Sequence, residues 1–134
     1  MANNISVAHL QAGDAKLALE AVEGTPAIFA QEGDFRRQGM ALGNMGSALE
    51  SLDRLDEAAD IYQQSADVLE QAGADELRAH VMQSLSSLQL RTGRRLQALA
   101  TMQSGLEGVE KPSPRQRLLK RLLQIPLDLI HKKK

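Results

Sequence analysis

Histidines and clustered carboxylates are the residues of this chain whose chemistry suits metal binding or acid–base catalysis. The three histidines, His9, His80 and His131, lie far apart in the sequence. None of them forms the helical pairing of ligands that a metal site needs. We therefore interpret each histidine as a surface or partly buried structural residue, and we predict no metal site.

The carboxylates Asp56 and Asp60 are four residues apart, on one face of an expected helix. Two carboxylates at this spacing could act as an acid–base pair, but they also suit the solvated start of a helix, where negative charge is favourable. The chain has no phosphate-binding glycine loop and no GxSxG motif, and the spacing of Gly39, Gly43 and Gly46 favours close helix packing. We predict no catalytic residue, no cofactor and no enzyme activity.

Composition points to helices as the elements that must position any functional residue. The 134 residues suffice for one domain, and 43% are hydrophobic but only 2% aromatic, so that Leu, Ala, Met and Val must form the core. The absence of cysteine excludes a disulfide framework. No stretch approaches the ~20 apolar residues of a membrane span, and the N-terminus does not resemble a secretory signal. We expect a soluble, cytoplasmic protein.

The formal net charge of −1 conceals a strong asymmetry along the chain. Residues 1–110 carry 16 acidic and 8 basic side chains, whereas residues 111–134 carry 8 basic side chains and 1 acidic side chain. Such segregation is typical of a docking segment or of a tail for an acidic partner. Only this tail could contact phosphates, and few aromatic residues are available to stack on bases, so we predict no specific nucleic-acid binding.

Small, apolar and turn-forming residues recur every 40 positions, which indicates an internal repeat. The aligned residues include Ala18, Ala58 and Ala98; Ile5, Met45 and Leu85; Val22, Tyr62 and Met102; and, at turns, Gly13, Asp53 and Gly93. We predict three helical units, at about 1–33, 34–73 and 74–110, followed by a basic amphipathic segment at 111–134.

Within these units, apolar spacing and capping residues predict individual helices. Asp14 and Asp34 are expected to cap helices, and Thr25 is expected to cap a segment that begins at Pro26. The expected helices cover residues 3–11, a stretch after residue 14, and residues 27–32, 34–52, 54–72, 75–91, 95–109 and 115–125.

The central unit resembles the tetratricopeptide repeat. The positions that carry the resemblance are Met45, Gly46, Leu49, Asp53, Ala58, Tyr62 and Ser65. The 40-residue period is similar to that of the longer-helix units in kinesin light chains and bacterial regulatory proteins, and the resemblance covers roughly residues 3–110. It implies an all-α solenoid of antiparallel helix pairs that works as a non-catalytic adaptor or scaffold for proteins.

In such arrays the first helix of each unit lines a concave groove, and the resemblance assigns partner-binding positions to the residues there that do not pack inward. These positions are Met40, Asn44, Ser47, Glu50, Ser51, His80, Gln83, Ser84, Ser87 and Arg91. The subset that clamps a terminal carboxylate has lysines and arginines where this chain has Gly43, Ser47, Gln83 and Ser87, so we do not expect that specificity. The alternative is that these residues are merely solvent-facing.

The segment 115–125 has leucines on one side and basic residues mostly on the other. We interpret it as a helix that caps the exposed end of the solenoid. The alternative is a basic amphipathic helix that reaches an anionic membrane or a partner. As the main function we expect binding of a peptide or helix of a protein partner in the groove. The alternative is a homo-oligomer that uses its end faces and the basic helix.

Overall fold

The computed structural model describes residues 14–107 and 114–123, and all regular structure in these ranges is helical. The expected helix at 3–11 lies outside the described residues, as do His9, His131 and the lysines at the C-terminus. The helices are α2 (Ala15–Val22), α3 (Thr25–Gln31), α4 (Phe35–Ser51), α5 (Leu55–Gln71), α6 (Asp75–Arg91), α7 (Arg95–Leu106) and α8 (Pro114–Leu123).

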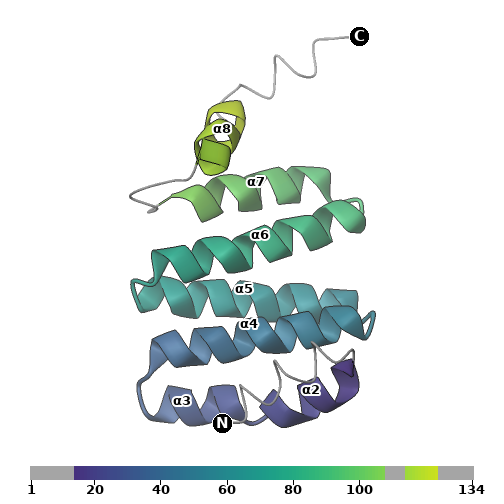
Figure 1. Cartoon of the computed structure of the whole chain (residues 1–134), viewed down its shortest axis with the longest axis vertical. Helices are drawn as coiled ribbons and strands as arrows, with labels where there is room; N and C mark the ends of the chain where they lie inside the picture. The colour runs from purple at the N-terminus through teal and green to yellow at the C-terminus, as the bar shows by residue number, and fades with distance from the viewer. Residues whose placement is uncertain (1–13, 108–113, 124–134) are drawn as a thin grey trace.

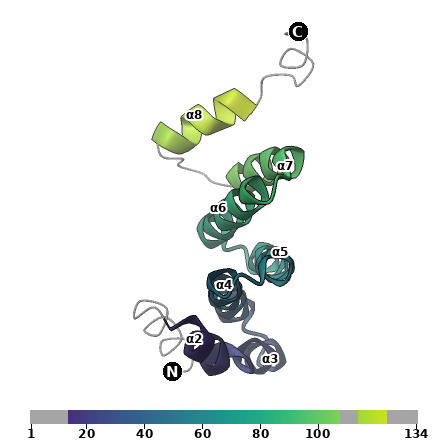
Figure 2. The ribbon, with the colours of Figure 1, turned by 90° about the vertical axis from the view of Figure 1, so that its right-hand side faces the viewer.

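From α3 to α8 each helix packs on the next one along the chain, and α2 packs beside α3 on α4 (Figure 1). Viewed nearly along the helix axes, α4 and α6 form one layer of the stack and α5 and α7 form the other (Figure 2). The fold is therefore an all-α solenoid of antiparallel helix pairs, as the 40-residue period predicts.

Four turns of the same design set the angle between successive helices. Gly33, Asp53, Gly73 and Gly93 have φ values of 71°, 60°, 67° and 80°. In each turn the amide after this residue donates to a carbonyl five residues earlier, for example from Arg54 to Leu49 at 2.9 Å. Aspartate tolerates the left-handed conformation better than most side chains, which explains why Asp53 stands where the other turns have glycine.

Side-chain caps are present where the sequence predicts them, with one exception. Asp14 and Asp34 each accept a backbone hydrogen bond of 3.1 Å, from Leu17 and Arg37. The predicted cap at Thr25 is wrong: Thr25 is the first residue of α3, and the N-cap is Gly24, with no side-chain hydrogen bond.

Helices α2 and α3 together occupy the register that α5 occupies one period later, so they are one second helix broken in two. The break follows from Pro26, which has no N–H for the carbonyl of Val22 and whose ring would clash with it. Pro26 is buried, so the break lies inside the packed face.

Two helix ends differ from the prediction. Helix α7 stops at Leu106, because Glu107 adopts an extended conformation with ψ of 138°, whereas we expected the helix to reach residue 109. Gly105 and Gly108 are poor helix formers and weaken this end. Helix α8 begins at Pro114, one residue earlier than expected, and its predicted last residues, 124–125, lie outside the described part.

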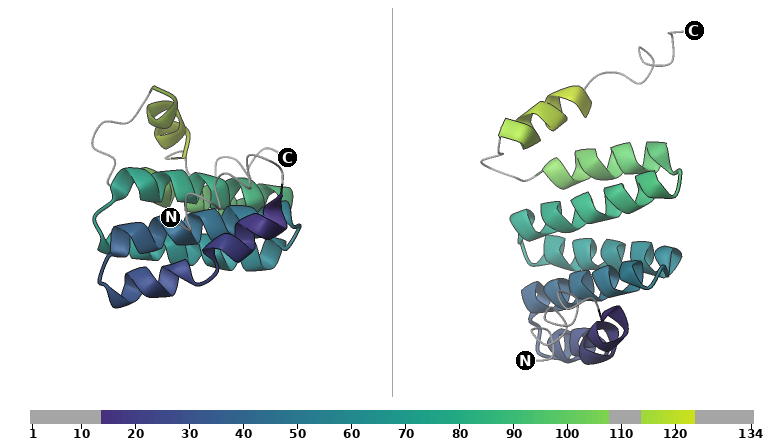
Figure 3. Two further views of the ribbon diagram at one scale, coloured as in Figure 1. Left: turned by 60° about the horizontal axis from the view of Figure 1, so that its bottom comes forward. Right: turned by 45° about the vertical axis from the view of Figure 1, so that its right-hand side comes forward.

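Helix α8 packs on α7 at the end of the stack and runs at an angle to it (Figure 3). Leu119 is half-buried against the preceding helices, but Leu118 and Leu122 are 57% and 51% exposed. The capping helix therefore covers the end of the solenoid with only part of its apolar face.

The core is built from small residues that let helices approach closely. The aligned alanines Ala18, Ala58 and Ala98 are fully buried. A Cβ built at Gly39 would lie 2.5 Å from the Leu69 side chain, so α4 and α5 could not pack at this distance with any larger residue there.

Gly46 faces the Tyr62 ring in the same way, which leads to a prediction about stability. A Cβ at Gly46 would lie 2.6 Å from a ring carbon of Tyr62. We expect Gly46→Ala to lower the free energy of unfolding by about 1–3 kcal/mol, measured by urea denaturation, because overpacking outweighs the better helix propensity.

Gly43→Ala is the matched control, because a Cβ there meets its nearest atoms at an ordinary 3.5 Å. This variant should be as stable as the wild type or up to about 1 kcal/mol more stable. Equal effects of the two substitutions would show that close packing at Gly46 is not what matters.

Candidate functional site

A small cavity of about 160 Å³ lies between α4 and α6, with α5 as its floor. Five of the ten predicted partner-binding residues line it: Met40, Asn44 and Ser47 from α4, and His80 and Ser84 from α6. Because His80 is exposed, the cavity opens to solvent. Its volume is below the roughly 300–1,000 Å³ of typical small-molecule pockets, so it suits a peptide side chain better than a cofactor.

Tyr62 reaches this cavity from α5 and organises one end of it. Its hydroxyl donates to Glu50 Oε1 at 2.9 Å and lies 3.1 Å from Ser47 Oγ. Since Tyr62 has a single proton and gives it to Glu50, Ser47 is the donor toward Tyr62. Ser47 Oγ also lies 3.2 Å from the carbonyl of Gly43, a second acceptor for the same proton.

Glu50 carries this network across the groove to the next unit. Its second carboxylate oxygen pairs with Arg91 Nη1 at 2.5 Å, so a single side chain on α4 joins both α5 and α6. Glu50 is only 24% exposed, which makes its hydrogen bonds stronger than those of a fully solvated pair. The predicted partner-binding residues Ser47, Glu50 and Arg91 are thus joined in one network within the chain.

The remaining predicted residues do not all share this cavity. Ser84 Oγ is placed to donate to the His80 carbonyl at 3.4 Å, and Ser51 is exposed at the last position of α4. Gln83 and Ser87 face the other side of α6 and line a different cavity. The structure therefore places five predicted residues at the first cavity and two at the second, whereas Glu50, Ser51 and Arg91 line neither.

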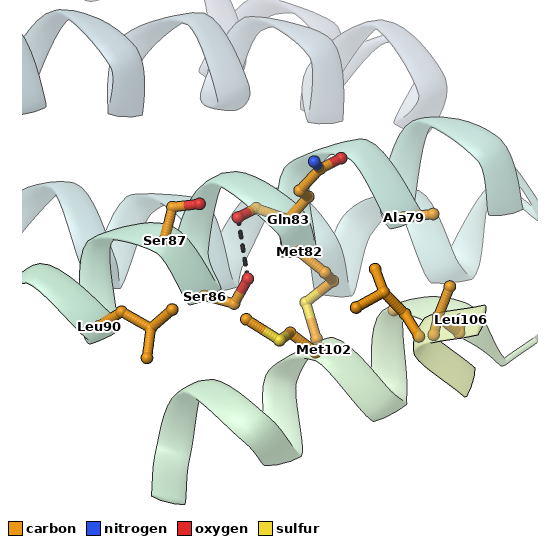
Figure 4. Close-up of a pocket in the computed structure, with 10 residues that line it drawn as sticks. Ala79, Met82, Gln83, Ser86, Ser87, Leu90, Met102 and Leu106 are labelled. Atoms are coloured by element: carbon orange, nitrogen blue, oxygen red, sulfur yellow. Dashed lines mark hydrogen bonds between the residues drawn. The ribbon is translucent and has the colours of Figure 1, made fainter. Parts of the chain in front are cut away.

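The second cavity, of about 410 Å³, lies between α6, α7 and α8 (Figure 4). Met82, Leu90, Met102, Leu106 and Leu119 give it a mainly apolar lining. Among its polar groups, the Ser86 hydroxyl donates to the Gln83 carbonyl of the same helix at 2.9 Å.

The carboxylates singled out in the sequence belong to a solvated helix start. Asp56 is in the first turn of α5 and pairs with Arg94 at 3.2 Å, and Asp60 is exposed. In the described ranges, no three His, Cys, Asp or Glu side chains gather closely enough to hold a metal ion.

A model of the family described as tetratricopeptide repeat matches residues 37–111, more than half of the chain. The chain belongs to the tetratricopeptide repeat family. A search of curated proteins finds no match.

Membership of the tetratricopeptide repeat family supports a protein–protein interaction module, because such repeats generally bind proteins and do not catalyse reactions. None of the helices in the described ranges has the length and apolar character to cross a membrane.

Sequence reasoning missed two contributions to this tetratricopeptide surface. The repeat aligns Tyr62 with Val22 and Met102, which indicates only a packing residue, yet its hydroxyl reaches the first cavity. The available signal was that a buried tyrosine needs a hydrogen-bond partner and that Tyr62 is the only tyrosine in the chain. The second cavity was also missed, because its lining residues Met102 and Leu90 look like ordinary core residues in the sequence.

Burial raises the pKa of the Tyr62 hydroxyl well above its usual value. Donation from Ser47 opposes this shift, whereas donation to Glu50 and the charge of that carboxylate add to it. The neutral hydroxyl is therefore the form that the folded chain selects.

This shift predicts a loss of stability at alkaline pH. The unfolded chain releases the tyrosine proton above about pH 10, before the folded chain does, so the unfolding free energy should fall there by at most about 1.4 kcal/mol per pH unit. Below that pH, Tyr62 should contribute no pH dependence. Urea unfolding of wild type and Tyr62→Phe across this range isolates the effect, because the lysines are common to both. Identical pH slopes would contradict it.

Proposed function

We propose that this chain is a non-catalytic adaptor that binds a peptide segment of a partner protein in the groove between α4 and α6. The observation that carries the proposal is the 160 Å³ cavity, in which polar side chains from two helices of the same layer surround an apolar floor. A peptide needs both components, because pockets take its side chains while polar groups pair with its backbone.

The floor and the rim have separate roles in this proposal. Tyr62 and Leu69 on the α5 floor, together with Val81 on α6, bury an apolar side chain of the partner, while Asn44 and Ser84 on the rim orient its backbone. Ser47 directs its proton toward Tyr62 and Gly43, so toward a peptide it acts as an acceptor.

The groove is preformed, which favours binding because little ordering is left to the moment of association. The hydrogen bond from Tyr62 and the ion pair with Arg91 both hold Glu50, and they tie α4, α5 and α6 together at this end of the groove. The backbone of Gly43 leaves the middle of the α4 wall without a side chain.

A side chain at position 43 would fill the empty space beside the α4 wall of the groove, and this substitution tests the proposal. Gly43→Gln introduces the residue that the chain itself has one period later, at Gln83, and its Cβ meets no close contact. Peptides are selected on the full chain by display, and their affinities are then measured by fluorescence anisotropy. We expect Gly43→Gln to weaken binding about tenfold or more, as expected when an apolar side chain loses its pocket.

Gly24→Gln is the matched control, because a Cβ at Gly24 meets nothing within 4 Å and the residue is exposed between α2 and α3. It should bind the selected peptides as the wild type does. If both variants bind equally well, while circular dichroism shows both to be folded, the groove between α4 and α6 is not the binding site.

Self-assembly is a second candidate function, favoured by the exposed Leu118 and Leu122 on the basic helix α8. Covering these leucines with a second copy would bury apolar surface, and the acidic body would attract the basic helix. We expect sedimentation velocity to show an oligomer that dissociates with salt and in the double variant Leu118→Ser, Leu122→Ser. A wild-type monomer at every concentration contradicts this.

A further inference from the structure

The second cavity lies on the next helix pair, and its lining residues Gln83, Ser87 and Met102 stand 40 residues after Gly43, Ser47 and Tyr62 of the first cavity, but its chemistry differs. Met102 stands at the position of Tyr62, and Leu90 stands at the position of Glu50. Ser87 corresponds to Ser47, yet here it has neither a tyrosine hydroxyl nor a carboxylate beside it in register. The hydrogen-bonded network of the first cavity is thus replaced by apolar side chains.

These apolar side chains are not fully buried by the chain itself. Leu90 is 45% exposed, and Met102 and Leu119 are half-buried; all three line the cavity. Met82 and Met102 provide two flexible, polarisable side chains that adapt to the shape of an apolar ligand group. The cavity is large enough, at about 410 Å³, for a large aliphatic or aromatic side chain.

Charge on the surrounding helices indicates the rest of the ligand. Helix α8, which contributes Leu119 to the cavity, carries the exposed Arg117 and Arg121 and no carboxylate. Helix α7 adds Arg95 and has no acidic residue, whereas α5 carries five carboxylates and no basic residue. A segment that lies over α7 and α8 therefore meets positive charge, and acidic side chains would complement it.

We propose that the second cavity binds one large apolar side chain of an acidic peptide segment, as an anchor additional to the contacts in the groove between α4 and α6. This inference rests on the proposed function, because it describes a further part of the same bound partner. The two cavities would then bind different residues of the partner. The first cavity, at Tyr62, takes a residue with polar and apolar groups, whereas the second cavity, at Met102, takes a purely apolar side chain flanked by carboxylates.

Methionine methyl groups provide a direct test, because they report separately on the two cavities. Met40 lines the first cavity, Met82 and Met102 line the second, and Met45 lies elsewhere, facing α2 and α5. The full chain, labelled with ¹³C at the methionine methyl groups, is titrated with four synthetic peptides that combine acidic or basic flanks with a central leucine or serine.

The acidic peptide with leucine should shift the Met82 and Met102 signals, and the central serine or basic flanks should weaken its binding about tenfold. Shifts at Met40 alone would overturn this inference and leave the proposed function intact. Shifts at Met45 alone would overturn both. Without peptide, the Met102 signal could also shift as the protein concentration rises. If sedimentation then shows dimers, the second cavity binds a second copy of the chain, and the inference is overturned.

Leu90→Glu supplies the matching variant, because it places in the second cavity the residue type that occupies this position in the preceding unit. Leu17→Glu is its control, since Leu17 on α2 is 44% exposed and far along the stack from the cavity. We expect Leu90→Glu to bind the acidic leucine peptide about tenfold more weakly and Leu17→Glu to bind as the wild type does. Equal affinities in the two variants would overturn the inference.

Discussion

Helices α4 and α5 approach so closely at Gly46 that the ring of Tyr62 occupies the space any Cβ would need. This contact sets the position of the ring, and the ring in turn sets the position of its hydroxyl, which reaches Ser47 and Glu50. Glu50, held there, can also pair with Arg91 on the next first helix. One steric constraint between two helices thus determines how three helices are held together around the groove.

The same constraint recurs with different partners along the solenoid. At Gly39 the absence of a side chain leaves room for the Leu69 side chain. The Ser65 hydroxyl also donates to the Gly39 carbonyl at 2.6 Å, which is possible only because the two backbones are close. In the next pair, α6 and α7, the Met82 side chain packs against Gly105. A glycine on either helix of a pair allows the same close distance between the two helices. The backbone arrangement therefore repeats along the solenoid, while the side chains that line the cavities change.

This separation of backbone and lining bears on the proposed binding. The Tyr62 cavity has a satisfied polar network, whereas the Met102 cavity has exposed apolar groups beside a basic helix. Two neighbouring cavities of one design can therefore recognise different parts of one partner. Charge changes along the stack as well, from the acidic α5 to the basic α8, and in the proposed complex this gradient orients the acidic segment.

The sequence alone determined the helical class, the 40-residue period and most helix ends, because these depend on local spacing, on capping by Asp14 and Asp34, and on the left-handed turn residues. The tertiary structure decided which side chains meet. It gave Ser47 and Glu50 partners inside the chain, and it placed five of the predicted residues at one cavity and two at another, with Glu50, Ser51 and Arg91 at neither. These outcomes depend on distances between helices, which arise from packing across residues far apart in the sequence and leave no local pattern.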